Sequence, residues 1–402
     1  MKPQRLGDRY TPRGSELAER GLAERAIEVA VQIGERSHGA RMVQVCRRSC
    51  AYSRRMAQRW KHRPPGSSWG EFGPDDQRGR MNYVTRDKVL QGVAEVKDGR
   101  TFCLSLPLDH PGGNVLNPRR HPPRLAPTLR GEAANFCFAL GDENPLHTDV
   151  MCDDVVLLTL QYSTQWDSLA HVGSRFDADG DGVAERVFYN GFRAGEDVTV
   201  PPANPAAERW ARYEGSRAAA LGIQNLAEHG AQGRGVLIDL HAHFGRERRP
   251  IGHDELMRVM DRDGVVVEKG DLVCFYTGFA DVVLEMARQP DAARLHATCT
   301  GLDGRDDRLL AWISDSGAAA LIADNYAVEL IPGEAYRPTP HAYLPLHEHC
   351  LFKNGIHLGE LWYLTELAQW LRAHGRNRFL LTAPPLRLPG AVGSPAAAVA
   401  TV

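Results

Sequence analysis

Short apolar runs alternate along the chain with segments of helical spacing. The runs predict strands at residues 101–106, 155–160, 236–240 and 378–382, and strands or strand-turn units at 271–277 and 318–330. Apolar stretches bounded by turn residues are typical of buried strands. Helical spacing predicts a helix capped by Thr85 or Asp87, with Val89, Leu90, Val93 and Val96 facing inward, and further helices at 15–33, 206–228 and 359–374. Strands interleaved with helices predict the α/β fold class.

Residues 155–171, VVLLTLQYSTQWDSLAH, combine an apolar run with a cluster of polar side chains. The first half predicts a buried strand, and Gln161, Gln165, Asp167 and His171 follow at odd positions. Alternate residues of an extended chain share one face, so these four side chains are expected on the same side. Polar groups on an otherwise apolar strand are unfavourable unless they converge on a partner. This stretch is therefore the main candidate for a functional site.

Two later segments add candidate residues. Asp324 and Asn325 follow a buried run and either border the pocket or form a structural turn. His347 and Glu360 flank the sequence LFKNGI, and His349 is the alternative to His347. A lone histidine is usually structural, but His347 is accompanied by Glu360.

The order Gln161-x-x-Thr164-Gln165-x-Asp167-x-x-x-His171 resembles the motif His-x-Gly-Thr-His-x-Asp-x-Pro-x-His of the cyclase family of metal-dependent hydrolases. The two glutamines stand at the positions of the family's metal-binding histidines, so the chain resembles a branch with STQWD in place of GTHxD. The phrase SDSGAAALIADNYAVE and the spacing of His347 and Glu360 also resemble segments of this family.

The resemblance covers residues 69–385 and implies a single domain of the swivelling β/β/α type that forms a homodimer. It implies hydrolysis of an amide, formamide, lactam or lactone bond of a small molecule. Asp167 and His171 are then expected as catalytic residues, and the expected metal ligands are Gln161, Gln165, Asp167, His347 and Glu360. The expected substrate-binding residues are Thr164, Trp166, Asp324 and Asn325.

The candidate residues suit hydrolysis by an activated water molecule. A divalent cation lowers the pKa of water, and His171 is suited to move the proton because imidazole titrates near neutrality. Imidazole ligands suit zinc, whereas amide oxygens favour manganese, so either Mn²⁺ or Zn²⁺ is expected. The replacement of two histidines by glutamines leaves an alternative, a metal-free small-molecule binding protein or a cyclase or isomerase on the same fold.

Charge is unevenly distributed along the chain. The formal net charge is -2, whereas residues 1–68 alone hold 15 Lys and Arg against 6 Asp and Glu. This basic segment, with its tract at 41–63, has no aromatic interleaving or nucleic-acid-binding motif, so we interpret it as a peripheral extension and predict no nucleic-acid partner. Residues 386–402, rich in Pro and Ala, predict a C-terminal tail.

Three further observations limit the protein class. No apolar run approaches the roughly 20 residues that span a bilayer, and the eight scattered cysteines suggest reduced thiols in a cytoplasmic protein. The glycine-rich sequence GAQGRG precedes a strand, so it predicts a turn and no nucleotide site.

Two motifs resemble metal sites without completing them. Asp177, Asp179 and Asp181 open like a calcium loop, but Phe188 stands where the bidentate glutamate belongs, which favours a solvated acidic turn. His241 and His243 follow the strand at 236–240, and we expect them to form hydrogen bonds at the strand end.

Overall fold

The computed structural model describes residues 59–205, 215, 217–331 and 340–402. The chain divides after Gln58, and the unit considered below is Arg59–Val402. The predicted helix at 15–33, most of the basic tract at 41–63 and part of the predicted helix at 206–228 lie outside the described residues. Within the described part of the chain, no helix is both long and apolar enough to span a bilayer.

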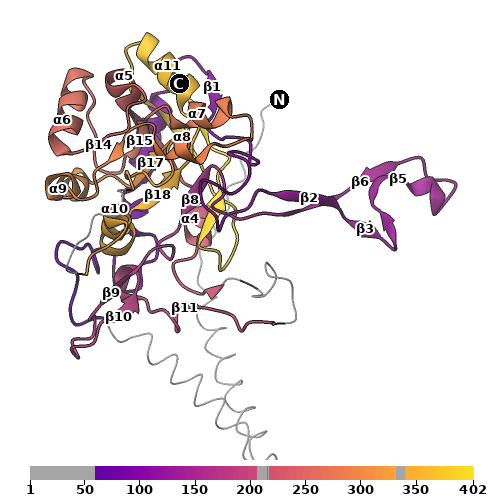
Figure 1. Cartoon of the computed structure of the whole chain (residues 1–402), viewed down its shortest axis with the longest axis horizontal. Coiled ribbons are helices and arrows are strands. Elements are labelled where there is room, and N and C mark those ends of the chain that lie inside the picture. The colour runs from indigo at the N-terminus through magenta and orange to yellow at the C-terminus, as the bar shows by residue number, and fades with distance from the viewer. Residues whose placement is uncertain (1–58, 206–214, 216, 332–339) are drawn as a thin grey trace, which may run out of the picture. The chain divides into compact units, whose positions relative to one another are not determined.

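A nine-stranded sheet organises the described residues (Figure 1). Its spatial order is β1 (Thr101–Cys103), β21 (Val399–Thr401), β19 (Arg378–Thr382), β13 (Gln232–Asp239), β15 (Leu272–Tyr276), β17 (Ala320–Ala323), β18 (His357–Glu360), β8 (Gln165–Asp167) and β20 (Gly393–Pro395). The strands β13, β15, β17 and β18 run parallel, and the outer strands pair antiparallel. The predicted α/β class is confirmed.

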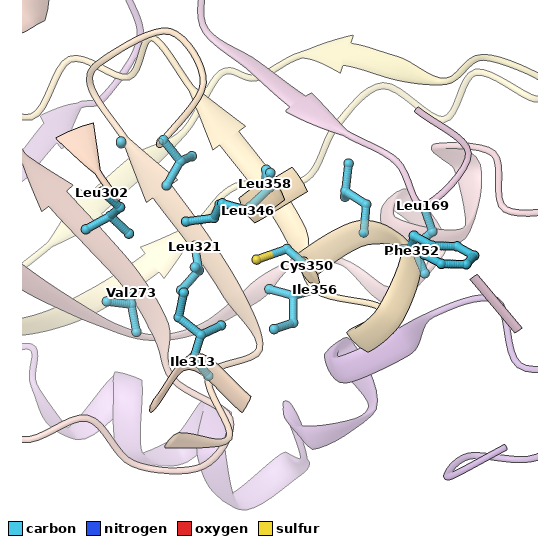
Figure 2. Close-up of a cluster of buried hydrophobic side chains, with 14 of the residues drawn as sticks. Leu169, Val273, Leu302, Ile313, Leu321, Leu346, Cys350, Phe352, Ile356 and Leu358 are labelled. Carbon is cyan, nitrogen blue, oxygen red and sulfur yellow. The ribbon is translucent and has the colours of Figure 1, made fainter. Parts of the chain in front are cut away.

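Apolar side chains cover both faces of this sheet. On one face, Val273 and Leu321 pack in a cluster with residues of α6 (His253–Arg262) and α9 (Asp307–Ser316) (Figure 2). On the other face, Cys274 and Ile322 pack in a cluster with residues of α11 (Thr365–Ala373). Complete burial of an aliphatic side chain stabilises the fold by roughly 1.5–3 kcal/mol. Both faces of the central strands are covered, so apolar side chains on either face contribute to stability.

The helix α3 (Arg86–Ala94) begins as predicted, but the residues that face the sheet differ from those predicted. The side chain of Thr85 accepts a hydrogen bond from the backbone N–H of Lys88, which is the expected cap. Leu90 and Val93 are exposed, contrary to the prediction. Gly92 faces the sheet instead, and a Cβ there would lie 2.8 Å from the backbone of Gly233. The helix packs so closely on β13 that a larger side chain does not fit.

The predicted buried strand at 155–160 is wrong. Residues 154–157 form β7 (Asp154–Leu157), which pairs with β2 (Arg124–Pro127) at one end of a two-stranded ribbon (Figure 1). Two shorter pairs continue the ribbon, β3 (Leu129–Arg130) with β4 (Ala133–Ala134) and β5 (Phe136–Ala139) with β6 (Val150–Cys152). Val155 is 53% exposed. The apolar run therefore lies in a ribbon that is exposed to solvent on both faces.

Both predicted ends of the domain also need correction. Residues 386–402 are not a tail, because β20 and β21 belong to the sheet and Ala396, Ala398 and Ala400 are buried. Alanine is small enough to pack at these crowded positions, so the composition does not exclude a strand. At the other end Trp60 packs in the core, so the domain begins before the predicted residue 69.

Candidate metal centre and active-site cavity

The pairing of β8 with β18 places three polar side chains on one side of the sheet. Glu360 stands opposite Gln165 in this antiparallel pair, and Asp167 lies two residues further along β8. Residues opposite each other, and residues two apart, share a face. The Gln165 amide donates to Glu360 Oε2 at 2.8 Å, and all three residues are buried.

His347 reaches the same point from the helical turn α10 (Pro345–His347), which continues into the π-helical segment η5 (Glu348–Asn354). Its Nε2 lies 3.1 Å from Glu360 Oε1, and its Nδ1 lies 2.8 Å from Glu329 Oε1. Glu329 also accepts the backbone N–H groups of Leu346 and His347. Glu329 therefore fixes the orientation of the imidazole ring.

Burial and neighbouring charges at this point shift the pKa values strongly. Burial and the nearby Glu360 raise the pKa of Asp167 to about 8. Burial alone would lower the pKa of His347, but hydrogen bonds with Glu329 and Glu360 raise it to about 10. Burial would raise the pKa of Glu360, but the hydrogen bond with His347 lowers it. Burial is the larger cause of the Asp167 shift, and the Glu360 carboxylate adds to it.

The residues Asp167, His347 and Glu360, called the triad below, fit a divalent cation. Each offers one ligand atom, and these atoms lie within 4.8 Å of one another. Asp167 Oδ2 and the Gln165 amide oxygen are buried without a hydrogen-bond partner. When Nδ1 of His347 donates to Glu329, Nε2 is the ligand atom, the arrangement that orients metal-binding histidines. Two carboxylates, an imidazole and an amide oxygen suit zinc or manganese.

A cavity of about 800 Å³ lies against the triad. His347, Glu360, His171 and Gln161 line it. The Nε2 atom of His171 lies 3.8 Å from Asp167 Oδ1. Burial and the nearby His347 lower the pKa of His171 to about 4, below the near-neutral value expected from the sequence, so its imidazole is neutral at pH 7.

Gln161 contacts a different part of the structure from Gln165. It is a cavity-lining residue, and its amide packs so closely on Gly393 that a Cβ there would lie 2.4 Å from Gln161 Nε2. Neither Gln161 nor His171 lies on β8, which ends at Asp167. The predicted four-residue strand face is therefore wrong, although the chain folds so that all four side chains lie in or beside the cavity region.

The predicted substrate-binding residues Thr164 and Trp166 are structural. The Thr164 hydroxyl accepts from Leu106 N–H and donates to the carbonyl of Leu361. The Trp166 indole donates to the carbonyl of Ala383 and packs edge-on against Trp362. Both side chains are fully buried. Alternation on β8 explains this, because position 166 points away from Gln165 and Asp167.

Asp324 and Asn325 form a structural turn, so their predicted role in the pocket is also wrong. The Asp324 carboxylate accepts from the backbone of Thr277 and Gly278 and from the Thr277 hydroxyl. The Asn325 amide donates to the carbonyl of Thr300. Their neighbours Tyr326 and Ala327 line the cavity instead.

The remaining histidines of the sequence analysis lie elsewhere. His349 bonds Ser314 and Asn354, so His347 is the histidine of the triad. His243 pairs with Asp263 at 2.8 Å after the end of β13, as expected for a hydrogen bond at a strand end.

The carboxylates of the acidic turn at residues 177–181 form hydrogen bonds and an ion pair within the protein. Asp177 accepts backbone N–H groups of Gly180 and Asp181, and Arg193 pairs with Asp179. Asp177, Asp179 and Glu185 come close enough to hold an ion, but these contacts agree with the interpretation as a solvated turn.

All three triad residues were predicted from the sequence, but Glu329, which orients His347, was missed. Its signal was a single carboxylate in the apolar sequence AVEL, and such a group is buried only when it is paired. Arg120, whose Nη1 lies 3.9 Å from Glu360 Oε2, was missed as well. It lies in a loop sequence without periodicity, and only the fold brings it to Glu360.

A buried group of carboxylates and imidazole beside a large cavity defines the class of protein, an enzyme with a candidate divalent-metal site. The sequence model of the family named Cyclase matches residues 103–330, more than half of the chain, and the chain belongs to this family.

The chain is also similar to solved structures. A crystal structure described as a novel cyclase is 28% identical, with a TM-score of 0.62, and the match covers 85% of this chain and 100% of that chain. Isatin hydrolase A from Ralstonia solanacearum is 15% identical, with a TM-score of 0.46 and coverage of 78% and 95%. The comparison with curated proteins found no match.

Proposed function

We propose that the protein is a metal-dependent hydrolase that cleaves an amide, formamide, lactam or lactone bond of a small molecule. The observation that carries this proposal is the triad with two unpartnered buried oxygens, of Asp167 and Gln165, beside the cavity. Leaving such oxygens without a partner is unfavourable by about 1–3 kcal/mol each. A bound cation would remove that penalty.

The contacts of each residue suggest its role in the proposed reaction. Asp167, His347 and Glu360 would hold the cation, with the amide oxygen of Gln165 as a further donor. When bound, the cation supplies a lowered pKa for water and polarisation of the carbonyl under attack. His171 accepts the proton of the attacking water at Nε2 and returns it to the leaving nitrogen or oxygen. Glu329 keeps the His347 ring in place.

The test is an activity screen over small lactones, lactams and N-formyl arylamines. Hydrolysis should be lost with EDTA and restored by Mn²⁺ or Zn²⁺. Hydrolysis that persists after complete removal of metal would contradict the proposal. Substoichiometric metal without hydrolysis of any of these compounds would favour the metal-free alternative. Homodimer formation and a cytoplasmic location stay predictions from the sequence.

A further inference from the structure

The cavity beside the triad has an excess of positive side chains. Three arginines, Arg119, Arg120 and Arg248, line it. Among the described lining residues, Glu360 supplies the single carboxylate. Glu360 already accepts a hydrogen bond from Gln165, and its Oε1 lies 3.1 Å from Nε2 of His347. The cavity therefore offers positive charge that its own lining carboxylate does not balance, which favours a negatively charged ligand.

Arg120 is the arginine nearest the triad. Its Nη1 lies 3.9 Å from Glu360 Oε2, and its side chain is 23% exposed. This distance is an ion-pair separation beyond hydrogen-bond length, so the guanidinium keeps N–H donors for a ligand. Arg248 differs, because it is exposed and donates to the carbonyl of Ile331 at 2.9 Å.

The backbone holds Arg120 at the cavity wall. Its N–H donates to the carbonyl of Asn117 at 3.0 Å, which closes a tight turn. The next N–H, of His121, donates to the hydroxyl of Thr159 at 3.1 Å. Thr159 also lines the cavity. A guanidinium on a wall fixed in this way binds with a smaller entropic penalty than one on a free loop.

Aromatic side chains also line the cavity. Tyr162, Tyr326 and Tyr343 line the cavity together with Leu116 and Leu361. A volume of about 800 Å³ is within the usual range for sites that enclose small organic molecules. The lining therefore suits a ligand with a flat apolar ring and one anionic group.

We propose that Arg120 binds the carboxylate of a small aromatic acid and that such acids are the substrate class of this site. The substrate assignment rests on the proposed function, whereas the binding of the acid does not. Arginine suits the role because its planar fork can donate two parallel hydrogen bonds to a carboxylate. A carboxylate bound on Arg120 would hold the ring in the cavity that His347 and Glu360 also line.

Benzoate and benzamide test this inference, because they share a ring and differ in charge. We expect wild-type protein to bind benzoate at least tenfold more tightly than benzamide in ligand-observed NMR titrations. Arg120→Gln should bring the two affinities to within about twofold, and a tenfold change corresponds to about 1.4 kcal/mol. Arg120→Lys should fall between, since it keeps the charge and loses the fork. Arg308→Gln, at an exposed arginine outside the cavity lining, is the matched control and should keep the wild-type ratio.

A benzoate preference that survives Arg120→Gln would overturn the inference, because the carboxylate would then bind elsewhere, for example on the metal. An equal affinity of wild-type protein for both compounds would overturn it too. If Arg120→Gln does not fold, as judged by its thermal melt, the Arg120→Lys ratio decides. The titrations need no turnover, so a failure of the proposed hydrolysis leaves their outcome readable.

Discussion

Asp167 is the residue on which the site depends most. It is buried, one of its oxygens has no partner, and its pKa is raised to about 8. We predict that Asp167→Asn abolishes metal binding and activity but leaves the fold intact, because asparagine has the same shape without the charge. Metal content after gel filtration and the thermal melt check this. Asp177→Asn, in the acidic turn, should keep the metal. Full metal occupancy in Asp167→Asn would remove Asp167 from the ligand set.

Substitution of His171 should impair proton transfer without affecting metal binding. Its side chain lines the cavity and lies beside Asp167, but its imidazole is not one of the triad. We predict that His171→Ala retains the metal and lowers kcat by about 10²–10⁴-fold, the usual contribution of a positioned acid or base. Steady-state kinetics and metal analysis of the same preparation provide the measurement. An unchanged kcat would show that His171 only packs against the site.

At the level of elements, α3 packs so closely on β13 that the contact does not tolerate a larger side chain. Alanine normally stabilises a helix interior relative to glycine by roughly 0.5–1 kcal/mol. Gly92→Ala should do the opposite and destabilise the protein by about 1–3 kcal/mol, because the new Cβ would meet the backbone of Gly233 at 2.8 Å. Gln91→Ala, exposed on the same helix, is the control. Urea unfolding measures both, and an unchanged midpoint for Gly92→Ala would contradict this packing.

Elements with a strong local signal were predictable from the sequence. The strands β15 and β19 and the cap of α3 agree with the apolar runs and with Thr85. The ribbon and the C-terminal strands were not predictable in this way. An apolar run such as 155–157 has the same pattern in a core strand and in a solvent-exposed ribbon. The pairing of β20 with β8 depends on contacts across more than 200 residues of sequence.

At the scale of the whole molecule, the site assembles from segments far apart in the chain. The pairing of β8 with β18 brings Gln165 and Asp167 beside Glu360, and Arg120 and Glu329 reach the same place from other parts of the chain. The motif around Asp167 and the pair His347 and Glu360 could be found from the sequence by resemblance. Glu329 and Arg120 could not, because their role depends on which segments the fold brings beside them.

Anomalous diffraction from crystals soaked in Mn²⁺ tests the central claim most directly. The account predicts a strong peak within bonding distance of Asp167, His347 and Glu360, with the Gln165 amide oxygen turned toward it. Crystals of Asp167→Asn treated in the same way should lack that peak. Wild-type crystals without density at the triad, or with a peak only at the acidic turn near Asp177, would contradict the claim that this cluster is the metal centre.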